Sequence, residues 1–315
     1  MEIIILAIIV ALTFIYEFGN GMNDAANAVS TIVATKAMSL RSALLMSAFG
    51  NFLGPFLLGV AVAETIGRGI VETRVITPPD IVILLISAIV WAYLATLRGL
   101  PISITHCIVG SLVGIGLVTD INSVVFSKLF IVLAFVVIGP VMGIITAFIV
   151  EYVLLSLLKN SSEKLNYLFR KLQIVTSFLF NMSHGANDSQ NGMGIIAMAL
   201  FVLGFIQQFT VPLWVILTSA LAISLGTYVG GVRVIRMAGM KIMKLKPYSG
   251  FCSEGAAAFT LAYSTILGIP VSSSHSQVEE HEDNIPELDI HNSAYCCDER
   301  WVVYNLQNFV LIYSP

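Results

Sequence analysis

The chain has 315 residues, of which 57% are hydrophobic and 11% are charged, and its mean hydropathy is +0.88. A soluble domain carries roughly 25% charged residues, so this chain lacks the polar surface that a water-soluble fold needs. The composition excludes a soluble enzyme, a nucleic-acid-binding protein and a disordered protein. The formal net charge of −3 arises in the acidic segment 276–300, because the remainder of the chain is mildly basic. We therefore predict a polytopic membrane protein.

Apolar stretches long enough to cross a bilayer, which takes about 20 residues, recur along the chain. They lie at residues 3–18, 42–63, 81–97, 129–158, 171–206 (interrupted by polar residues), 212–230 and 251–267, with two shorter pieces at 24–35 and 102–118. The runs are continuous rather than alternating, and backbone groups in lipid must be paired within their own segment, so we predict helices and an all-α fold. The first run lacks a basic leading region and is interpreted as a retained helix rather than a signal peptide.

Lysine and arginine gather in two loops, and positively charged loops remain in the cytoplasm. The loops contain Lys159, Lys164, Arg170 and Lys171 in the first case and Arg233, Arg236, Lys241, Lys244 and Lys246 in the second. Both are assigned to the cytoplasm, which agrees with the even number of crossings between them. The pairs Lys36/Arg41 and Arg68/Arg74 flank one span from both ends and therefore do not orient the first half.

Two polar motifs each occur twice, in the same order along the chain. Gly21-Met22-Asn23-Asp24-Ala25-Ala26-Asn27 returns as Gly185-Ala186-Asn187-Asp188-Ser189-Gln190-Asn191, an offset of 164 residues. Gly99-Leu100-Pro101-Ile102-Ser103-Ile104-Thr105-His106 returns as Gly268-Ile269-Pro270-Val271-Ser272-Ser273-Ser274-His275, an offset of 169 residues. Paired polar segments at corresponding positions of two halves are typical of secondary transporters. We predict that both Asn-Asp motifs lie in one central site related by a pseudo-two-fold axis.

The Asn-Asp motif places a carboxylate within an apolar sequence. A carboxylate at membrane depth costs at least about 2.5–3.5 kcal/mol, so it rarely lacks a partner or a purpose. One interpretation is that Asp24 and Asp188 are solvated in interfacial loops. The other, which we favour, is that each lies at a helix break and binds a cation or proton that enters with the substrate. The neighbouring amides can donate to an anion or accept from a cation; they are Asn23, Asn27, Asn187 and Asn191.

The second motif predicts a helix N-terminus. Proline suits the first helical turn, and the serine two residues later, Ser103 or Ser272, stands beside free N–H groups and the positive end of the helix dipole. Such a terminus binds anions, and the hydroxyls of Thr105 and Ser274 add donors. The alternative is ordinary N-capping by the same serine, which does not explain why the whole octapeptide recurs.

The remaining ionisable residues in apolar stretches are less specific. His106 and His275 recur, whereas His184 has its counterpart at Asn20, and hydrogen-bonded structural histidines are favoured over a proton relay. Glu254 either neutralises a basic loop or helps to bind a cation. Glu17 and Glu64 are expected at the membrane interface.

The motif pair, with the run Ser183-His184-Gly185-Ala186-Asn187-Asp188-Ser189-Gln190-Asn191-Gly192-Met193-Gly194, resembles the inorganic phosphate transporter (PiT) family, most closely its shorter bacterial and archaeal members. The resemblance covers about residues 1–275 and implies two inverted repeats with broken or re-entrant helices and cation-coupled phosphate uptake through the cytoplasmic membrane. Carried over residue by residue, the substrate site would contain Asn23, Asp24, Asn27, Ser103, Thr105, Asn187, Asp188, Ser272, Ser273 and Ser274. The candidates for the coupling cation are Asp24, Asp188, Asn27, Asn191 and Glu254.

The C-terminal region departs from the family pattern. The family continues after the second motif with a further helix, whereas His275 is followed here by the acidic stretch and by a short apolar run at 301–313. We expect a truncated or divergent second half. The predicted units are a first repeat (1–158), a basic cytoplasmic loop (159–171), an incomplete second repeat (172–275) and an acidic tail without fixed structure (276–315).

The predicted function is import of inorganic phosphate by symport with Na⁺ or H⁺, without enzymatic activity, cofactor or metal beyond Na⁺. The expected partners are phosphate, the bilayer and a second copy of the chain in a homodimer, with no nucleic acid. The alternatives are a carrier of another oxyanion such as sulfate, a transport-defective truncated homologue and, remotely, an intramembrane aspartyl protease. A protease dyad needs two carboxylates that share a proton, but it needs neither the asparagines nor the duplicated Pro-Ser motif.

Overall fold

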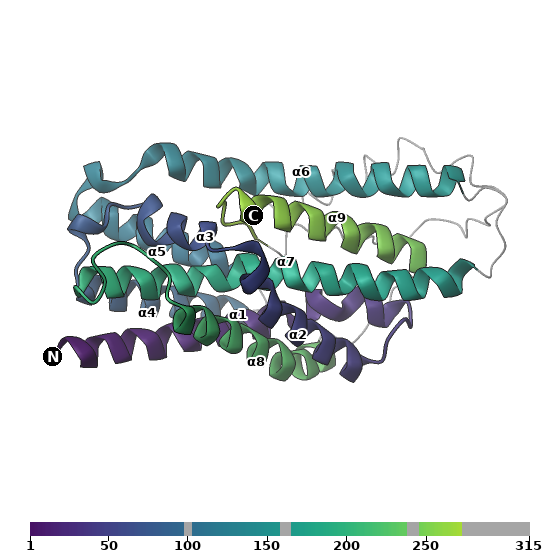
Figure 1. The fold of residues 1–315 in the computed structure, drawn as a ribbon, viewed down its shortest axis with the longest axis horizontal. Helices are drawn as coiled ribbons and strands as arrows, with labels where there is room; N and C mark the ends of the chain where they lie inside the picture. Colours follow the sequence, from purple (N-terminus) through teal and green to yellow (C-terminus); the bar gives the residue numbers. More distant parts are fainter. Residues whose placement is uncertain (98–102, 158–164, 238–245, 273–315) are drawn as a thin grey trace.

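The computed structural model describes residues 1–97, 103–157, 165–237 and 246–272, which form helices joined by short connections (Figure 1). The α-helices in these ranges are α1 (Glu2–Ala34), α2 (Leu40–Leu58), α3 (Ala61–Glu64), α4 (Pro78–Leu97), α5 (Ile104–Thr119), α6 (Phe126–Leu157), α7 (Leu165–Val202), α8 (Leu213–Met237) and α9 (Pro247–Ile266). A π-helical turn, η1 (Thr65–Gly69), and two 3₁₀ turns, η2 (Thr73–Val75) and η3 (Ile121–Ser123), complete the set. The predictions for Ser273, Ser274, His275 and the acidic tail lie outside the described residues.

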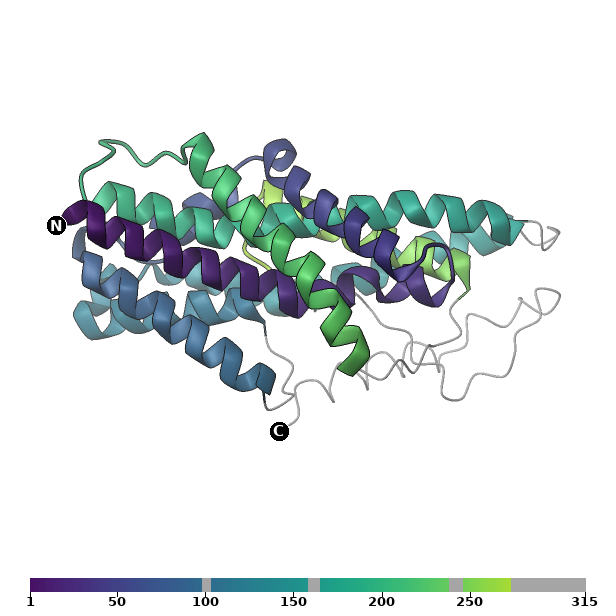
Figure 2. The same ribbon diagram turned by 90° about the horizontal axis from the view of Figure 1, so that it is seen from below.

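The long helices α1 and α7 run side by side in opposite directions through the molecule (Figures 1 and 2). Helix α1 packs extensively on α8, and α7 packs in the same way on α2. Helix α4 packs on α1, and α9 packs on α7, again with α4 and α9 running in opposite directions (Figure 1). Among the described helices, α1 and α4 thus have counterparts of reversed direction in α7 and α9, and α8 packs on α1 as α2 packs on α7.

The two Asn-Asp motifs lie inside uninterrupted helices, so the prediction of a helix break at each motif is wrong. Helix α1 runs unbroken for 33 residues and takes in the apolar pieces 3–18 and 24–35, and α7 runs unbroken for 38 residues. The helix propensity of Asn and Asp is at most about 0.7 kcal/mol below that of Ala, which tertiary packing readily outweighs. The motif side chains bond to neighbouring helices and leave the helical backbone intact.

The described break lies instead at Gly59, within the stretch 42–63 that the hydropathy predicts as a plain span. Helix α2 and the segment Ala61–Gly69 meet there at 74°. Gly59 has a φ of +80°, a conformation open to glycine and costly for other residues. A backbone N–H beyond the bend is paired with a protein group rather than with lipid, because the side chain of Gln190 accepts from the Ala63 N–H at 3.0 Å.

Among the residues that the structure describes, three helices, α1, α6 and α8, are long and apolar enough to cross a membrane, and the bent pair of α2 with residues 61–69 makes a fourth candidate span. Helices α4 and α5 contain shorter apolar segments. Helix α6 exposes large apolar side chains along its length, among them Phe130, Leu133 and Ile145. A surface of this kind fits lipid rather than water, in agreement with the predicted all-α polytopic membrane fold.

Candidate functional site

The central feature of the molecule is a histidine between two aspartates. Nε2 of His184 lies 3.2 Å from Oδ2 of Asp188 and 3.6 Å from Oδ2 of Asp24. His184 and Asp188 stand one turn apart on α7, whereas Asp24 comes from α1, and all three side chains are buried. The structure therefore brings the aspartates of both Asn-Asp motifs to a single imidazole.

Hydrogen bonds from two further helices fix the tautomer of this histidine. The hydroxyl of Thr227 donates to the carbonyl of Ile223 at 2.9 Å, so its oxygen is left to accept from Nδ2 of Asn51, also at 2.9 Å. The amide oxygen of Asn51 consequently faces Nδ1 of His184 at 3.0 Å and accepts its proton. Nε2 is then the ring nitrogen that faces the two carboxylates.

Two buried carboxylates around one nitrogen need a positive charge between them. The ligand atoms of Asp24, His184 and Asp188 lie within 4.8 Å of one another, a spacing that can hold a metal ion. Either a second proton on the imidazole or a bound cation would supply the charge. A site that exchanges the two is suited to cation-coupled chemistry.

A continuous polar face on each long helix leads through this centre. On α1 and its C-cap the buried polar residues are Thr13, Glu17, Asn20, Asp24, Thr31 and Thr35. Successive members of this set are four, three, four, seven and four residues apart. On α7 the buried polar residues that share one such face are Gln173, Ser177, Asn181, His184, Asp188 and Asn191. Spacings of three, four and seven residues keep side chains on one helix face. We refer to these twelve residues as the polar seam.

The first glycine of each Asn-Asp motif allows the helices to approach closely. A Cβ on Gly21 would overlap the backbone of Ile223 in α8, and a Cβ on Gly185 would overlap the backbone of Asn51 in α2. The motif therefore combines a contact that only glycine permits with an aspartate one turn later. This contact places Asn51 beside His184.

The serine and threonine of the first Pro-Ser motif lie at the start of α5, as predicted. Ser103 is the N-cap of α5 and its Oγ accepts from the backbone N–H of His106 at 3.3 Å. The hydroxyl of Thr105 accepts from Nδ2 of Asn191 at 3.0 Å. Tyr16 of α1 donates to the carbonyl of Ile104 at 3.0 Å and so fixes this helix end against α1. The arrangement joins the first Pro-Ser motif to the second Asn-Asp motif.

The second Pro-Ser motif reaches the same helix. Asn187 donates to the hydroxyl of Thr265 at 2.9 Å and to the carbonyl of Ile269 at 3.3 Å, and its Oδ1 accepts from the Val271 N–H at 3.3 Å. These bonds hold the segment up to Val271 against α7. The next residue, Ser272, is buried, with 7% of its surface exposed. Asn187 and Asn191 are four residues apart on α7, so the two Pro-Ser motifs meet α7 one turn from each other.

Glu254 lies apart from the central group. Its carboxylate accepts from the hydroxyl of Thr31 and, at 3.4 Å, from that of Thr176. Thr31 follows Asp24 by seven residues, which corresponds to about 10 Å along α1. Thr35 donates to the Gln173 side chain at 2.7 Å in the same region. The structure therefore places Glu254 in a second polar cluster near the end of the seam, away from the two aspartates.

The other predicted residues lie around these groups. Asn23 is partly buried with its Nδ2 3.5 Å from Oδ1 of Asp24, and Asn27 is also partly buried. Glu64 is exposed and paired with Arg68 at 2.9 Å, as expected for an interfacial residue. Glu17 is fully buried, so its predicted interfacial position is wrong. The helical spacing of Glu17, Asn20 and Asp24 was the sequence signal for a buried polar face.

Asn51, Thr227, Gln190 and His184 belong to the site but are not among the predicted site residues, and His184 was expected to be a structural histidine. Gln190 lies within the second Asn-Asp motif, and Asn51 and Thr227 lie outside both repeated motifs. A polar side chain inside the apolar stretches of α2 or α8 was the signal for Asn51 and Thr227.

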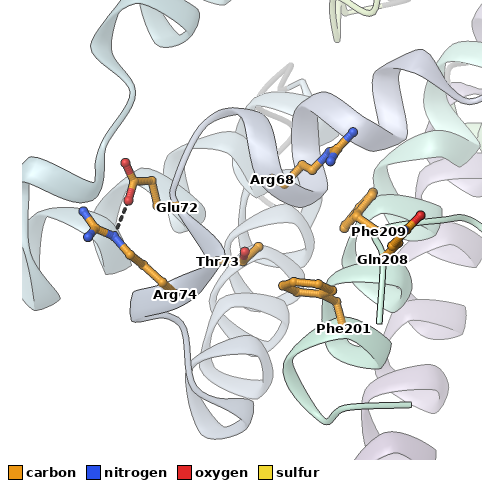
Figure 3. Close-up of a pocket in the computed structure, with 7 residues that line it drawn as sticks. All are labelled: Arg68, Glu72, Thr73, Arg74, Phe201, Gln208 and Phe209. Carbon is orange, nitrogen blue, oxygen red and sulfur yellow. Dashed lines mark ion pairs between the residues drawn. The ribbon is translucent and has the colours of Figure 1, made fainter. Parts of the chain in front are cut away.

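A surface pocket of about 610 Å³ lies elsewhere, at the C-terminal end of α7 (Figure 3). Arg68 packs over the ring of Phe209 at 5.2 Å, and Arg74 pairs with Glu72. Phe201 completes an aromatic wall, and the two guanidinium groups point to different sides of the pocket (Figure 3). Phe201 follows Asp188 by 13 residues, about 20 Å along α7, so the pocket is separate from the central site.

The sequence profile of the Phosphate transporter family matches residues 20–164 and 156–279. The chain belongs to this family. It is 39% identical over 271 residues to a probable low-affinity inorganic phosphate transporter of Rhizobium meliloti, an alignment that covers 85% of this chain and 81% of that protein. A relative of the same description from Bacillus subtilis is 35% identical over 276 residues, with 86% and 82% coverage.

The fold gives the same result as the sequence. A solved structure described as the sodium-dependent phosphate transporter superposes with a TM-score of 0.80 at 26% identity, covering 98% of this chain and 95% of that chain. The predicted family, the all-α membrane fold and the multi-pass membrane localisation are thereby confirmed. The relatives and the structural neighbour are transporters, which also confirms that this phosphate transporter family protein is not an enzyme.

Proposed function

We propose that the protein imports inorganic phosphate through the cytoplasmic membrane by symport with a cation, Na⁺ or H⁺. The observation that carries the proposal is the position of Asp24 and Asp188 on either side of His184 Nε2. A cation or proton taken up there balances the two carboxylates and lets an anion approach. The names of the relatives and of the structural neighbour support phosphate as the anion. The name of the structural neighbour favours Na⁺ as the cation.

The phosphate site in this proposal is built from hydrogen-bond donors rather than arginine. Free N–H groups at the start of α5, with the dipole behind them, bind an oxyanion beside Ser103 and Thr105. On the second half Asn187 holds the segment that leads to Ser272 through Ile269 and Val271, and the donors are the hydroxyls of Ser272, Ser273 and Ser274. Asn23 and Asn27 complete the set from α1. The meeting of both Pro-Ser motifs one turn apart on α7 supports a single shared site.

The cation site in this proposal uses the oxygens of Asp24, Asp188 and Asn27, with Asn191 and Glu254 as further stations along the seam. Carboxylate and amide oxygens suit hard cations. A proton would bind instead to His184 or to one of the carboxylates.

We also propose that the two halves are inverted repeats related by a pseudo-two-fold axis in the membrane plane. The antiparallel pairs α1/α7 and α4/α9 support this relation, as does the exchange of neighbours, α1 with α8 and α7 with α2. In transporters of this construction the substrate binds at the repeat interface near the bilayer midplane.

The proposal is tested by uptake of radiolabelled phosphate into proteoliposomes that contain the purified protein. An imposed Na⁺ gradient and an imposed proton gradient are compared at equal membrane potential, and the gradient that drives uptake above equilibrium identifies the coupling ion. Unlabelled phosphate, arsenate and sulfate are added as competitors. Sulfate carries no proton at neutral pH and cannot donate to a carboxylate, so phosphate and arsenate should compete and sulfate should not. Competition by sulfate as strong as by phosphate would instead identify a general oxyanion carrier.

A further inference from the structure

Glu17 is a buried carboxylate that the proposed phosphate site does not use. Its side chain on α1 is fully buried, and Oε1 accepts from the backbone N–H of Gly192 on α7 at 2.6 Å. The other oxygen, Oε2, is buried and forms no hydrogen bond with any described residue. A desolvated carboxylate with an unsatisfied oxygen is unfavourable unless a positive partner joins it.

The side chains near this oxygen offer further acceptors, together with the Nδ2 amide donor of Asn20. Asn20 lies one turn after Glu17 on the same face of α1, with its amide beside the carboxylate. Asn191 precedes Gly192, the residue bonded to Glu17, and its Nδ2 is already used by Thr105. The amide oxygens of Asn20 and Asn191 are buried and lack hydrogen bonds within the described ranges. Three buried oxygens of the kind that ligate hard cations therefore belong to residues at or next to the Glu17–Gly192 contact between α1 and α7.

The repeat contains its own comparison for this position. The offset of 164 residues that relates the Asn-Asp motifs pairs Glu17 with Asn181. Asn181 satisfies every polar atom of its side chain: Nδ2 donates to the carbonyls of Ala28 and Ser177 at 3.2 and 2.8 Å, and Oδ1 accepts from Ser47. A neutral amide thus suffices where only helix packing is required. The carboxylate at the corresponding position leaves an oxygen available to a ligand.

The position of Glu17 also places it on the route to the central group. Glu17 precedes Asp24 by seven residues, about 10 Å along α1 and on nearly the same helix face. Thr31, which bonds Glu254, follows Asp24 by the same seven residues. Two buried glutamates therefore flank the Asp24–His184–Asp188 group, one on each side along the seam.

We propose that Glu17, Asn20 and Asn191 form a Na⁺ site on the N-terminal side of Asp24, a station for the coupling cation in addition to the central group. The inference rests on the proposed symport and assigns it a further cation ligand. Na⁺ bound there neutralises Glu17 before or while phosphate occupies the site at the start of α5, to which Asn191 is joined through Thr105.

The test measures phosphate uptake into proteoliposomes as a function of Na⁺ concentration, with choline as the replacement ion, for the full chain and its Glu17→Gln variant. Glutamine retains the shape of the side chain and an oxygen for the Gly192 N–H. We expect the Na⁺ concentration for half-maximal uptake to rise at least about tenfold, with the half-saturating phosphate concentration at saturating Na⁺ changed much less. Glu64→Gln, an exposed glutamate at a helix end, is the matched control and should leave both values unchanged.

Two further measurements keep the outcome decisive. Size-exclusion chromatography in detergent tests folding, and Glu17→Asp, which keeps the charge, should recover part of the Na⁺ affinity. Equilibrium binding of ²²Na⁺ to the purified protein should show a site that Glu17→Gln weakens.

If the unmodified protein takes up phosphate and folded Glu17→Gln has the same Na⁺ dependence, the inference is wrong while the symport stands. If the unmodified protein takes up phosphate independently of Na⁺, the Na⁺ site is also wrong. Absence of phosphate uptake by the unmodified protein together with unaltered ²²Na⁺ binding by Glu17→Gln would overturn both.

Discussion

At the scale of single residues, the two aspartates reach the imidazole of His184 from different helices. Asp188 shares α7 with His184, whereas Asp24 reaches the same ring nitrogen from α1, so the pair depends on the approach of two helices. Asn51 and Thr227, from α2 and α8, orient the ring. Four helices therefore determine the position of one imidazole, and a shift of any of them alters the distance between the carboxylates.

Asp24→Asn and Asp188→Asn should each abolish coupled phosphate uptake and leave the protein folded. The substitution removes the negative charge that holds the cation, and it also removes the desolvation cost of a buried carboxylate. A charged hydrogen bond contributes roughly 1.5–3 kcal/mol, so cation affinity should fall by about ten- to a hundredfold. Proteoliposome uptake and detergent size-exclusion profiles are the measurements. A variant that accumulates phosphate at the unmodified rate would remove that aspartate from the site.

Gly185→Ala should destabilise the protein strongly, because the added Cβ would overlap the backbone of Asn51 in α2. Overpacking of this kind costs roughly 1–3 kcal/mol and more where backbone must move. Gly114→Ala in α5, where nothing lies within 4 Å of the new Cβ, is the control and should be neutral or stabilising by about 1 kcal/mol. Thermal unfolding in detergent compares the two. Similar midpoints for both variants would contradict the close α2–α7 contact.

At the scale of helices, the start of α5 has two roles that can be separated. Ser103 caps the helix through the His106 N–H, and Ser39 caps α2 through the Ser42 N–H at 3.4 Å, but Ser39 is exposed and far from the motifs in sequence. Ser103→Ala and Ser39→Ala should each lose about 1 kcal/mol of stability. Only Ser103→Ala should also raise the half-saturating phosphate concentration. An equal effect of both variants on uptake would mean that Ser103 acts as a cap alone.

The helices also show which features the sequence could predict. The repeated motifs predicted one site containing both aspartates, and the apolar stretches predicted the helical fold. The continuity of α1 and α7 could not be predicted, because polar side chains in an apolar sequence look like a break until their partners on other helices are known. The partners of Asn187 on the segment after α9 are an example. The bend at Gly59 was missed because hydropathy does not report backbone direction.

Glu17 illustrates the same difficulty at the site. Near the end of an apolar run, a carboxylate can equally be solvated or buried, and hydropathy does not distinguish the two. The periodicity of the neighbouring polar residues on α1 does distinguish them, because Thr13, Glu17, Asn20 and Asp24 occupy one face. The polar face of α1 could thus be predicted from the sequence, whereas the residues of α7 that pack against it could be identified only from the fold.

At the scale of the whole molecule, the described connections divide between two ends. The turn from α1 to α2 and the starts of α7 and α9 lie at one end, and the turn from α5 to α6 lies at the other (Figures 1 and 2). Arg170, Lys171 and Lys246 belong to the first end, next to the basic loops, and so do Lys36 and Arg41 of the α1–α2 turn. The positive-inside rule then assigns this end to the cytoplasm and the pocket around Arg68 to the outer face.

This orientation predicts the sidedness of two exposed positions. In a cysteine-free background, a cysteine at Ser39, between α1 and α2, should react with a membrane-impermeant maleimide only after the membrane is permeabilised. A cysteine at Asn122, in η3 between α5 and α6, should react in intact cells. Both residues are exposed in the structure, so a difference in labelling reports the side of the membrane rather than burial. The reverse labelling pattern would invert the assigned orientation and place Glu17 on the cytoplasmic side of the central group. Glu17 would then be the last cation site before release instead of the first. Labelling of both positions in intact cells would show that the two turns do not lie on opposite membrane faces, and the polar seam could then not connect the two sides.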